Sequence, residues 1–431
     1  MSITIRGEEH PHTDQASVRC RVGRHRTGRN HSDGLHSLLA VREIRALWMA
    51  QVLSSMGDQV AQVAIAVLVY ARTGSPFVTA LAYALTYLPL AAGRPLLSRL
   101  VDSFPQRQVL ITLDLVRAGL LELMALPQMP LPWIGSLLFV VMLLAPPFSE
   151  ARADLLRQFL PERRLGRVSP FGTLTSQASQ AAGFLAGGVL VATLGPDRSL
   201  VLDGLSFCLS ACLITYWVKQ SSAPKNPRSA EPSPARADEA VIFHRPALRT
   251  LVLLSWLAGF AVVPEGLAVP YAHALGGGAT TAGLLMATMP AGMVTGALVI
   301  RRLARPDEQE RMIGWLAMLS CAPLISSVVR PPLWLVLPLW GLAGVGATYQ
   351  LTVARVLVGA LPSAQRARAF TTAQTGLLTA QALGILIAGA AAARIGPQMV
   401  VAVAGLIGVT TATALASDWA RHHAAPTDGS H

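Results

Sequence analysis

The stretch SSMGDQVAQVAIAVLVY, residues 54–70, is apolar or small at most positions and yet contains one carboxylate, Asp58. With its flanking residues this run is long enough to cross about 30 Å of hydrocarbon as an α-helix. An ionised carboxylate at the centre of a membrane costs about 2.5–3.5 kcal/mol on insertion scales, so it normally faces a partner, a cavity or a proton pathway. The stretch therefore predicts a membrane helix whose carboxylate has a specific task.

The rest of the chain repeats this composition. Of its 431 residues, 52% are hydrophobic and only 13% are charged, which is the balance of a membrane protein. Apolar runs of about 20 residues recur and are separated by short polar breaks. We therefore expect an all-α membrane protein with twelve transmembrane helices, at 46–71, 77–101, 108–127, 133–157, 168–194, 199–218, 248–273, 279–301, 311–329, 332–358, 369–393 and 397–416.

Arginine indicates the orientation of these spans, because loops on the cytoplasmic side keep positive charge. The short loops after even-numbered spans carry eleven arginines, whereas those after odd-numbered spans carry four. Both termini and the 219–247 segment are therefore expected in the cytoplasm. The N-terminal tail has no apolar signal-peptide region, so we expect the first span to direct insertion into the plasma (inner) membrane. The net charge of +12 follows from the same rule, and we expect no nucleic-acid partner.

A linker divides the spans into two groups of six. Residues 219–247 switch to Ser, Pro, Ala and charged residues, as is typical of a linker. Chance matches between helices rich in Ala and Leu are common, but prolines and Gly-Pro pairs that match at one offset favour an internal duplication. The two groups align without a gap at an offset of 201 residues, which pairs Tyr70 with Tyr271, Pro89 with Pro290, Gly188 with Gly389, and Gly195-Pro196 with Gly396-Pro397.

The duplication predicts two pseudo-symmetric six-helix bundles, at 46–218 and 248–416. A disordered, basic cytoplasmic tail is expected at 1–45, and a second cytoplasmic tail at 417–431. Glycines in the fifth and eleventh spans leave room for helices to approach closely, either for ordinary packing or for movement. These glycines are Gly183, Gly187, Gly188, Gly384 and Gly389.

Several stretches resemble a known family. The stretches LWMAQVLSSMGDQVAQVAIAVLVYARTGSP at 47–76, LVDSFPQRQVLITLDLVRA at 100–118 and LPERRLGRVSPFGTLTSQASQAAGFLAGGVLVATLGP at 160–196 are similar to the major facilitator superfamily, and within it to drug and siderophore exporters that work as proton antiporters. The resemblance covers about 38–416 and implies two six-helix bundles around a central cavity lined by spans 1, 4, 7 and 10. The antiporter signature of span 5 normally contains Gly-Pro, whereas this chain has Gly183-Phe184.

The family's signature loop between spans 2 and 3 is matched in part. The pattern Gly-x-Leu-Ala-Asp-Arg-x-Gly-Arg-Arg corresponds here to SRLVDSFPQRQ, which keeps Asp102 and Arg107 but replaces other charged positions. The resemblance implies that Asp102 holds a cytoplasmic gate by engaging basic groups. Arg152 is our first candidate for its partner, and Asp154 belongs to the same run of alternating charges at the inner end of span 4.

Two carboxylates are candidates for proton coupling and substrate binding. Asp58 lies near the middle of the first span, and Glu265 lies in the seventh span between Pro264 and Gly266, where a helix break is expected. On the functional interpretation, both take up and release the coupling proton, or meet a cationic substrate, as the bundles rock. On the structural alternative, each carboxylate is held in an ion pair or a hydrogen bond between helices.

Other polar residues within the spans have more modest expected roles. Asp114 and Arg117 stand at positions i and i+3 of a helix and are expected to form a structural ion pair. Asp203 lies near the outer start of the sixth span, where we expect an interfacial position. Candidate cavity contacts, for which helix packing is the alternative, are Gln62, Trp256, Tyr349 and Gln350.

These features predict a secondary active transporter that exports a small hydrophobic or amphipathic molecule, such as a drug, a natural product or a siderophore-like compound, by proton antiport with alternating access. We expect a monomer in the lipid bilayer, with its substrate and protons as partners and with no cofactor or metal. A proton-coupled or facilitative importer of a small metabolite on the same fold is the first alternative, and a non-transporting scaffold or sensor is a remote one. An enzyme is not expected, because the sequence contains neither His-Glu-x-x-His nor Gly-x-Ser-x-Gly.

Overall fold

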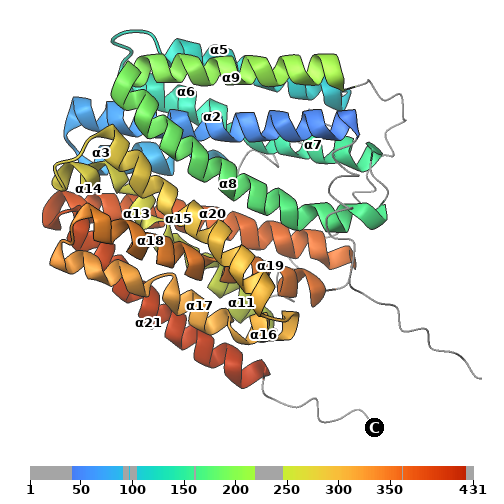
Figure 1. Cartoon of the computed structure of the whole chain (residues 1–431), viewed down its shortest axis with the longest axis vertical. Coiled ribbons are helices and arrows are strands. Elements are labelled where there is room, and N and C mark those ends of the chain that lie inside the picture. Colours follow the sequence, from blue (N-terminus) through green and yellow to red (C-terminus); the bar gives the residue numbers. More distant parts are fainter. Residues whose placement is uncertain are drawn as a thin grey trace, which may run out of the picture. The chain divides into compact units, whose positions relative to one another are not determined.

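The chain folds into helices, several of which are long enough to cross a membrane (Figure 1). The computed structural model describes residues 41–90, 97, 104–159, 162–218, 246–361 and 363–423. Residues 1–40 of the expected N-terminal tail, nearly all of the linker and the end of the C-terminal tail lie outside the described residues, whereas residues 42–45, expected in the disordered tail, belong to helix α2. The contacts reported below are all within Arg42–His431, which forms one compact unit.

The first six expected spans fall on helices in chain order. The helix bounds are α2 (Arg42–Thr73), α3 (Pro76–Ala84), α5 (Gln106–Met124), α6 (Leu131–Leu143), α7 (Ala145–Phe159), α8 (Glu162–Leu194) and α9 (Pro196–Trp217). The fourth span is thus divided between α6 and α7, and the inner end of the second span lies outside the described residues. We call α2 to α9 the first half.

The last six expected spans also fall on helical segments, which we call the second half. Their bounds are α11 (Pro246–Trp256), α12 (Ala258–Ala261), α13 (Val263–Gly266), α14 (Ala268–Ala274), α15 (Ala279–Leu303), α16 (Pro306–Arg311), α17 (Ile313–Leu319), the 3₁₀-helix η1 (Ala322–Val329), α18 (Leu333–Ala347), α19 (Tyr349–Gly359), α20 (Ser363–Ile395) and α21 (Pro397–His423).

Length and hydropathy identify most of these segments as membrane spans. Within the described residues, nine helical segments are long and apolar enough to cross a membrane, and two shorter apolar segments, Pro76–Leu90 and Ile313–Val329, accompany them. The third expected span is α5, a helix of 19 residues that carries four ionisable side chains, Arg107, Asp114, Arg117 and Glu122. The twelve expected spans therefore all correspond to helix.

The Gly-Pro pairs that the 201-residue offset aligns adopt the same turn. Gly195 and Gly396 both have a φ of 85°, and each immediately precedes a helix that begins with proline. A positive φ favours glycine, and proline suits the first helical position because the N–H that it lacks would have no partner there. The two halves therefore repeat the same local structure at equivalent positions.

The seventh span is interrupted as its prolines predict. It consists of α11, α12, α13 and α14, which are separated by the single residues Leu257, Val262 and Leu267. Pro264 and Pro270 each remove a backbone donor from the helix ladder and so favour an irregular course. Glu265 lies within α13, in the interrupted region.

Contacts between helix ends show which ends lie together. The guanidinium groups of Arg42 and Arg45 lie over the Trp217 ring, at 5.1 and 5.7 Å from its centroid, so α2 begins beside the end of α9. At the other end of α2, the Arg72 side chain donates to the Met129 carbonyl oxygen over 2.6 Å, and the ring of Tyr70 lies 5.5 Å from that of His273. We call the end with Arg42 the inner end and the end with Tyr70 the outer end.

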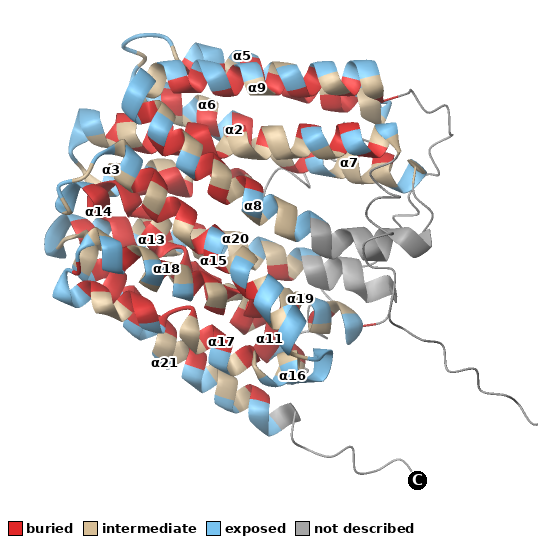
Figure 2. Ribbon diagram, viewed as in Figure 1, coloured by how far each residue is buried: buried red, intermediate tan, exposed pale blue. Residues whose placement is uncertain are grey.

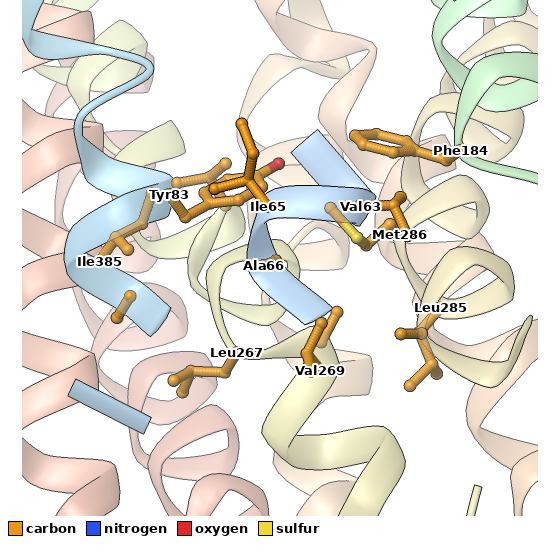
Figure 3. Packing of buried hydrophobic residues seen from close by; sticks show 14 of the residues in the cluster. Val63, Ile65, Ala66, Tyr83, Phe184, Leu267, Val269, Leu285, Met286 and Ile385 are labelled. Carbon is orange, nitrogen blue, oxygen red and sulfur yellow. The ribbon is translucent and has the colours of Figure 1, made fainter. Parts of the chain in front are cut away.

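Within the described residues, the apolar core that the two halves share lies towards the outer end. One cluster of buried side chains draws on both halves, and Figure 3 shows Tyr83, Val63 and Phe184 of the first half packed with Leu267, Met286 and Ile385 of the second. At the inner end, a second cluster contains only second-half residues and a third contains only first-half residues. The halves are therefore joined by apolar packing at the outer end.

The helices carry apolar side chains on their outer faces and charged ones inside. Leu205 and Leu209 on α9 are each 52% exposed. Figure 2 shows further exposed residues, in pale blue, along α5 and α9. By contrast, Asp114, Arg117 and Asp203 on the same two helices are only 0%, 1% and 2% exposed. This arrangement suits a surface in contact with lipid and an interior that holds the polar chemistry.

Candidate functional site

Asp58, the carboxylate of the first span, is paired with Arg117. Asp58 Oδ1 lies 3.8 Å from Nη2 of Arg117, which projects from α5, and the two side chains are 22% and 2% exposed respectively. Arg117 also donates from Nε to the Val141 carbonyl oxygen over 3.3 Å, and its guanidinium lies 4.8 Å from the centroid of the Phe207 ring. A buried guanidinium needs such partners, because an uncompensated charge inside the protein is costly.

Arg117 and Asp114, which were expected to pair with each other, each have another partner in the structure. Arg117 forms its ion pair with Asp58, whereas Asp114 Oδ2 accepts a hydrogen bond of 2.6 Å from the Ser210 hydroxyl on α9. Sequence spacing places Asp114 and Arg117 on one face of α5, but it does not reveal which neighbouring helix offers a competing carboxylate. The role of Asp114 as a structural partner of Arg117 stays a prediction.

Asp203 lies against Asp58's neighbour, Gly57, and not at the membrane interface. It is fully enclosed, and a side chain at Gly57 would overlap the Asp203 carboxyl and the Ser206 hydroxyl. Ser206 donates to Asp203 Oδ1 over 3.1 Å. The interfacial position expected for Asp203 is therefore wrong. The missed signal was spacing, since Asp203, Ser206 and Ser210 recur along one face of a helix.

Glu265, the carboxylate of the seventh span, connects the two halves. The Tyr83 hydroxyl on α3 donates to Glu265 Oε2 over 3.0 Å, and the two residues are 182 positions apart in the chain. Beside Glu265, Gly266 lies so close to Ile385 of α20 that a β-carbon would be 2.7 Å from Ile385 Cγ2. Tyr83 was missed at the level of sequence, because an aromatic residue in an apolar helix usually indicates packing alone.

A small cavity lies next to this hydrogen bond. Its volume is about 10 Å³, roughly that needed to hold one water molecule. Gln62, one helical turn beyond Asp58 on α2, lines it together with Tyr83 and Thr86. The remaining lining residues are Ile65, Ala66, Ala82 and Leu138. The structure therefore brings Gln62, one of the candidate cavity contacts, to the same place as the partner of Glu265.

The other candidate cavity contacts lie elsewhere. The indole N–H of Trp256 donates to the Ala373 carbonyl oxygen over 3.3 Å. The Tyr349 hydroxyl donates to the Leu254 carbonyl oxygen over 2.9 Å, and Tyr349 is buried in the second-half apolar cluster at the inner end. Gln350 follows it on α19 and is half-buried. None of these three side chains lines the cavity beside Tyr83, and their contact with a substrate stays a prediction.

The expected cytoplasmic gate is described in part. Asp102 lies outside the described residues. Arg107 donates to the Thr215 carbonyl oxygen over 2.7 Å and so connects α5 with the end of α9. Asp154 pairs with Arg157 on the same helix, and the Nε of Arg152 is buried without a hydrogen-bond partner among the described residues. Engagement of Asp102 with Arg152 remains a prediction.

The second half has a comparable polar contact at its inner end, which the sequence analysis missed. Arg355 on α19 donates to Gln309 Oε1 over 3.1 Å and to the Pro306 carbonyl oxygen over 3.3 Å. Its guanidinium also lies 4.0 Å from Glu310 Oε1. Arg355 is the residue that the 201-residue offset pairs with Asp154, and that correspondence was the available signal.

Glycines permit close approach between the halves at the outer end. A β-carbon on Gly188 of α8 would be 2.9 Å from the Gly283 Cα of α15, and one on Gly389 of α20 would overlap Ala80 of α3. The offset of 201 residues pairs Gly188 with Gly389, so equivalent positions of the two halves form equivalent contacts. The prediction that these glycines allow helix backbones to approach closely is confirmed.

Comparison with known proteins agrees with this architecture. Residues 47–306, more than half of the chain, match the family model described as Major Facilitator Superfamily. An uncharacterized MFS-type transporter, YkuC of Bacillus subtilis (strain 168), is 25% identical over 176 residues, which cover 40% of this chain and 41% of that protein. The match thus spans less than half the length of this curated relative.

Solved transporter structures share the fold at low sequence identity. The nucleoside transporter NupG has a TM-score of 0.67 and 11% identity, with 87% of this chain and 99% of that chain covered. A D-xylose-proton symporter has a TM-score of 0.66 and 14% identity, with 86% and 97% covered. A bacterial homologue of the iron transporter ferroportin, in an inward-facing state, has a TM-score of 0.62 and 16% identity, with 89% and 99% covered. The all-α, multi-span fold expected from the sequence is confirmed.

Proposed function

Because the chain belongs to the Major Facilitator Superfamily, we propose that it is a proton antiporter that exports a small hydrophobic or amphipathic molecule. Drugs, natural products and siderophore-like compounds are the substrate classes we propose. The family and its solved relatives indicate a membrane transporter and not an enzyme. Export, substrate class and proton coupling are our additions to that assignment.

In this proposal the two halves rock about a central substrate site in the plasma membrane. The moving bundles are 46–218 and 248–416, the protein works as a monomer, and the tails and linker face the cytoplasm. Support comes from the helix ends, since α2 begins beside the end of α9, and Thr250 of α11 donates to Asp418 of α21 over 2.6 Å. Each half therefore starts and finishes on the same side.

The observation that carries the proposal is the hydrogen bond between Tyr83 and Glu265. It joins α3 of the first half to α13 of the second, next to the cavity that Gln62 lines. A hydroxyl donates more strongly to a carboxylate than to a neutral acceptor. The bond therefore favours outer closure when Glu265 is ionised, and it couples the charge of Glu265 to the contact between halves.

This coupling explains how an antiporter avoids futile proton leakage. After Glu265 has released its proton to the cytoplasm, the Tyr83 bond holds the empty protein closed to the outside. A substrate that offers a cationic or hydrogen-bonding group replaces Tyr83 at Glu265 and permits outward opening. Protonation of Glu265 from the outside then removes the charge and allows return without substrate. Asp58, paired with Arg117, is the second proposed coupling residue.

The first alternative is an importer on the same fold, either proton-coupled or facilitative. The D-xylose-proton symporter among the similar structures makes this alternative concrete, although at 14% identity the likeness concerns the fold alone. A scaffold or sensor without transport is the remote alternative. Import and export differ in the direction of proton-dependent flux, which everted membrane vesicles report directly.

The test begins with a panel of toxic compounds and metabolites, applied to cells with and without the protein. An exporter protects cells against its substrate, and everted vesicles then accumulate that compound when a proton gradient is applied. Protection that is lost in Glu265→Gln supports the proposal. Uptake into intact cells establishes the importer instead, and a complete lack of proton-dependent flux with every compound supports the scaffold.

A further inference from the structure

Three carboxyl groups surround one guanidinium inside the first half. We call Asp58, Asp114, Asp203 and Arg117 the carboxyl cluster; they come from α2, α5 and α9, and α9 packs against both α2 and α5. Arg117 lies 3.8 Å from Asp58, Ser210 connects Asp114 to α9, and Asp203 lies against Gly57. If all three carboxyl groups were ionised, the cluster would carry two uncompensated negative charges, each of which costs several kcal/mol inside a protein.

Among the described residues, the ion pairs place no basic side chain other than Arg117 on these carboxyl groups, and the buried Arg152 of α7 is not paired with any of them. Arg107 on α5 donates to Thr215, and the other basic residues of α2 and α9 lie at the helix ends. The described part of α8 from 172 to 194 contains no ionisable side chain. Glu122 on α5, which lies against Gly204 of α9, is exposed and adds only negative charge. In the proposal below, a bound cation supplies the balance.

Two unpartnered carboxyl oxygens offer places where that cation could bind. Asp114 Oδ1, Asp203 Oδ2 and Arg117 Nη2 are buried and have no hydrogen-bond partner among the described residues. The serine hydroxyls occupy the other oxygen of each carboxyl, with Ser210 on Asp114 Oδ2 and Ser206 on Asp203 Oδ1. The described residues contain no group of three or more His, Cys, Asp or Glu arranged to hold a metal ion. A proton, in contrast to a metal ion, needs only one carboxylate oxygen that has no other partner.

We propose that the carboxyl cluster stores protons: in the described arrangement Asp114 and Asp203 are protonated, while Asp58, the second proposed coupling residue, is ionised against Arg117. Each proton comes from the aqueous phase and converts one carboxylate into a neutral carboxyl group, without any other bond change. Asp58 is the cluster's contact with water, because its side chain is 22% exposed whereas Asp114 and Asp203 are enclosed. The cluster thus supplies proton sites in addition to the exchange step proposed at Glu265, and it does not depend on a substrate.

The test is infrared spectroscopy of the full chain in lipid nanodiscs at neutral pH. Aspartate is labelled with ¹³C at the side-chain carboxyl, so that the carbonyl band of a protonated aspartic acid shifts while that of glutamic acid does not. Wild type is expected to show this band. Asp203→Asn should lose about half of its intensity, and Asp114→Asn should do the same independently. Asp307→Asn changes an exposed carboxylate of α16 and should leave the band unchanged.

A variant at the arginine separates proton storage from a merely structural role. Arg117→Gln removes the compensating charge, so a third proton is needed and the band should be about 1.5 times as strong as in wild type. A wild-type protein without the band, or a band that survives both aspartate substitutions, overturns the proposal. So does a band that sodium ions abolish, because sodium would then fill the site. These readouts involve no transport, so their failure leaves the proposed export untouched.

Discussion

Tyr83 decides how the charge of Glu265 affects the outer closure. A hydrogen bond to a charged group contributes about 1.5–3 kcal/mol, and this one joins α3 of the first half to α13 of the second. Sequence alone identified Glu265 but not Tyr83, since 182 residues separate them and no local pattern records which helices become neighbours.

Tyr83→Phe removes only the donor and is expected to shift the protein towards its outward-open state by about 10-fold or more. The measurement is the distance between spin labels at the exposed outer positions Leu126 and Val329, one in each half. Tyr70→Phe provides the matched control, because the Tyr70 ring lies at the outer end but contacts His273 through its ring. An unchanged distance distribution in Tyr83→Phe would show that the bond does not hold the halves together.

Gly57 of α2 leaves room for the Asp203 carboxyl and the Ser206 hydroxyl of α9 at the carboxyl cluster. Gly57→Ala places a methyl group on the Asp203 carboxyl and the Ser206 hydroxyl and is expected to destabilise the protein by about 1–3 kcal/mol. Thermal unfolding in detergent measures this loss. Gly119→Ala on α5 meets open space and should stabilise the helix by about 0.5–1 kcal/mol. Equal stability of the two variants would contradict the close approach.

At the scale of elements, local sequence patterns predicted where the helices lie, but not which side chains of different helices bind each other. The lengths of the apolar runs predicted the helices, and the Gly-Pro pairs predicted the turns at Gly195 and Gly396. The prolines of the seventh span predicted the interruption around Glu265. Arg117 forms its ion pair with Asp58 of α2 and not with Asp114 of its own helix. Spacing along one helix constrains faces, but the competition between neighbouring helices depends on the three-dimensional arrangement.

The contact between α8 and α15 depends on glycines at its outer end. Gly188→Leu inserts a side chain where the Gly283 backbone lies and is expected to separate the halves, lengthening the distance between labels at Leu126 and Val329. Gly172→Leu on the same helix meets no atoms within 4 Å and serves as the control. The closure assignment fails if both leucine variants keep the wild-type distance.

At the scale of the whole molecule, the apolar clusters indicate which end is closed. One cluster crosses between the halves at the outer end, while the inner end has a separate cluster in each half. Interfaces built from packed side chains switch between discrete arrangements and do not deform gradually. The described arrangement therefore corresponds to the inward-facing state of the proposed cycle.

The orientation in the membrane is a prediction from arginine alone. A fluorescent reporter that folds only in the cytoplasm is expected to be bright when fused to either terminus, because even-numbered loops carry the positive charge. A fusion within the outer turn after α5 should be dark and is the control. Dark reporters at both termini would show that the topology is the reverse of the predicted one. The proposed direction of transport would then also be reversed, from export to import.

The coupling of Glu265 to proton movement is tested most directly in proteoliposomes that contain a pH-sensitive dye and purified protein. A compound from the toxicity panel is supplied on the inner-end side, and proton flux is followed in wild type and in Glu265→Gln. We expect protons to move opposite to the compound in wild type and this exchange to vanish in the variant, while the compound still binds. Exchange of equal size in Glu265→Gln would contradict the central role of this carboxylate.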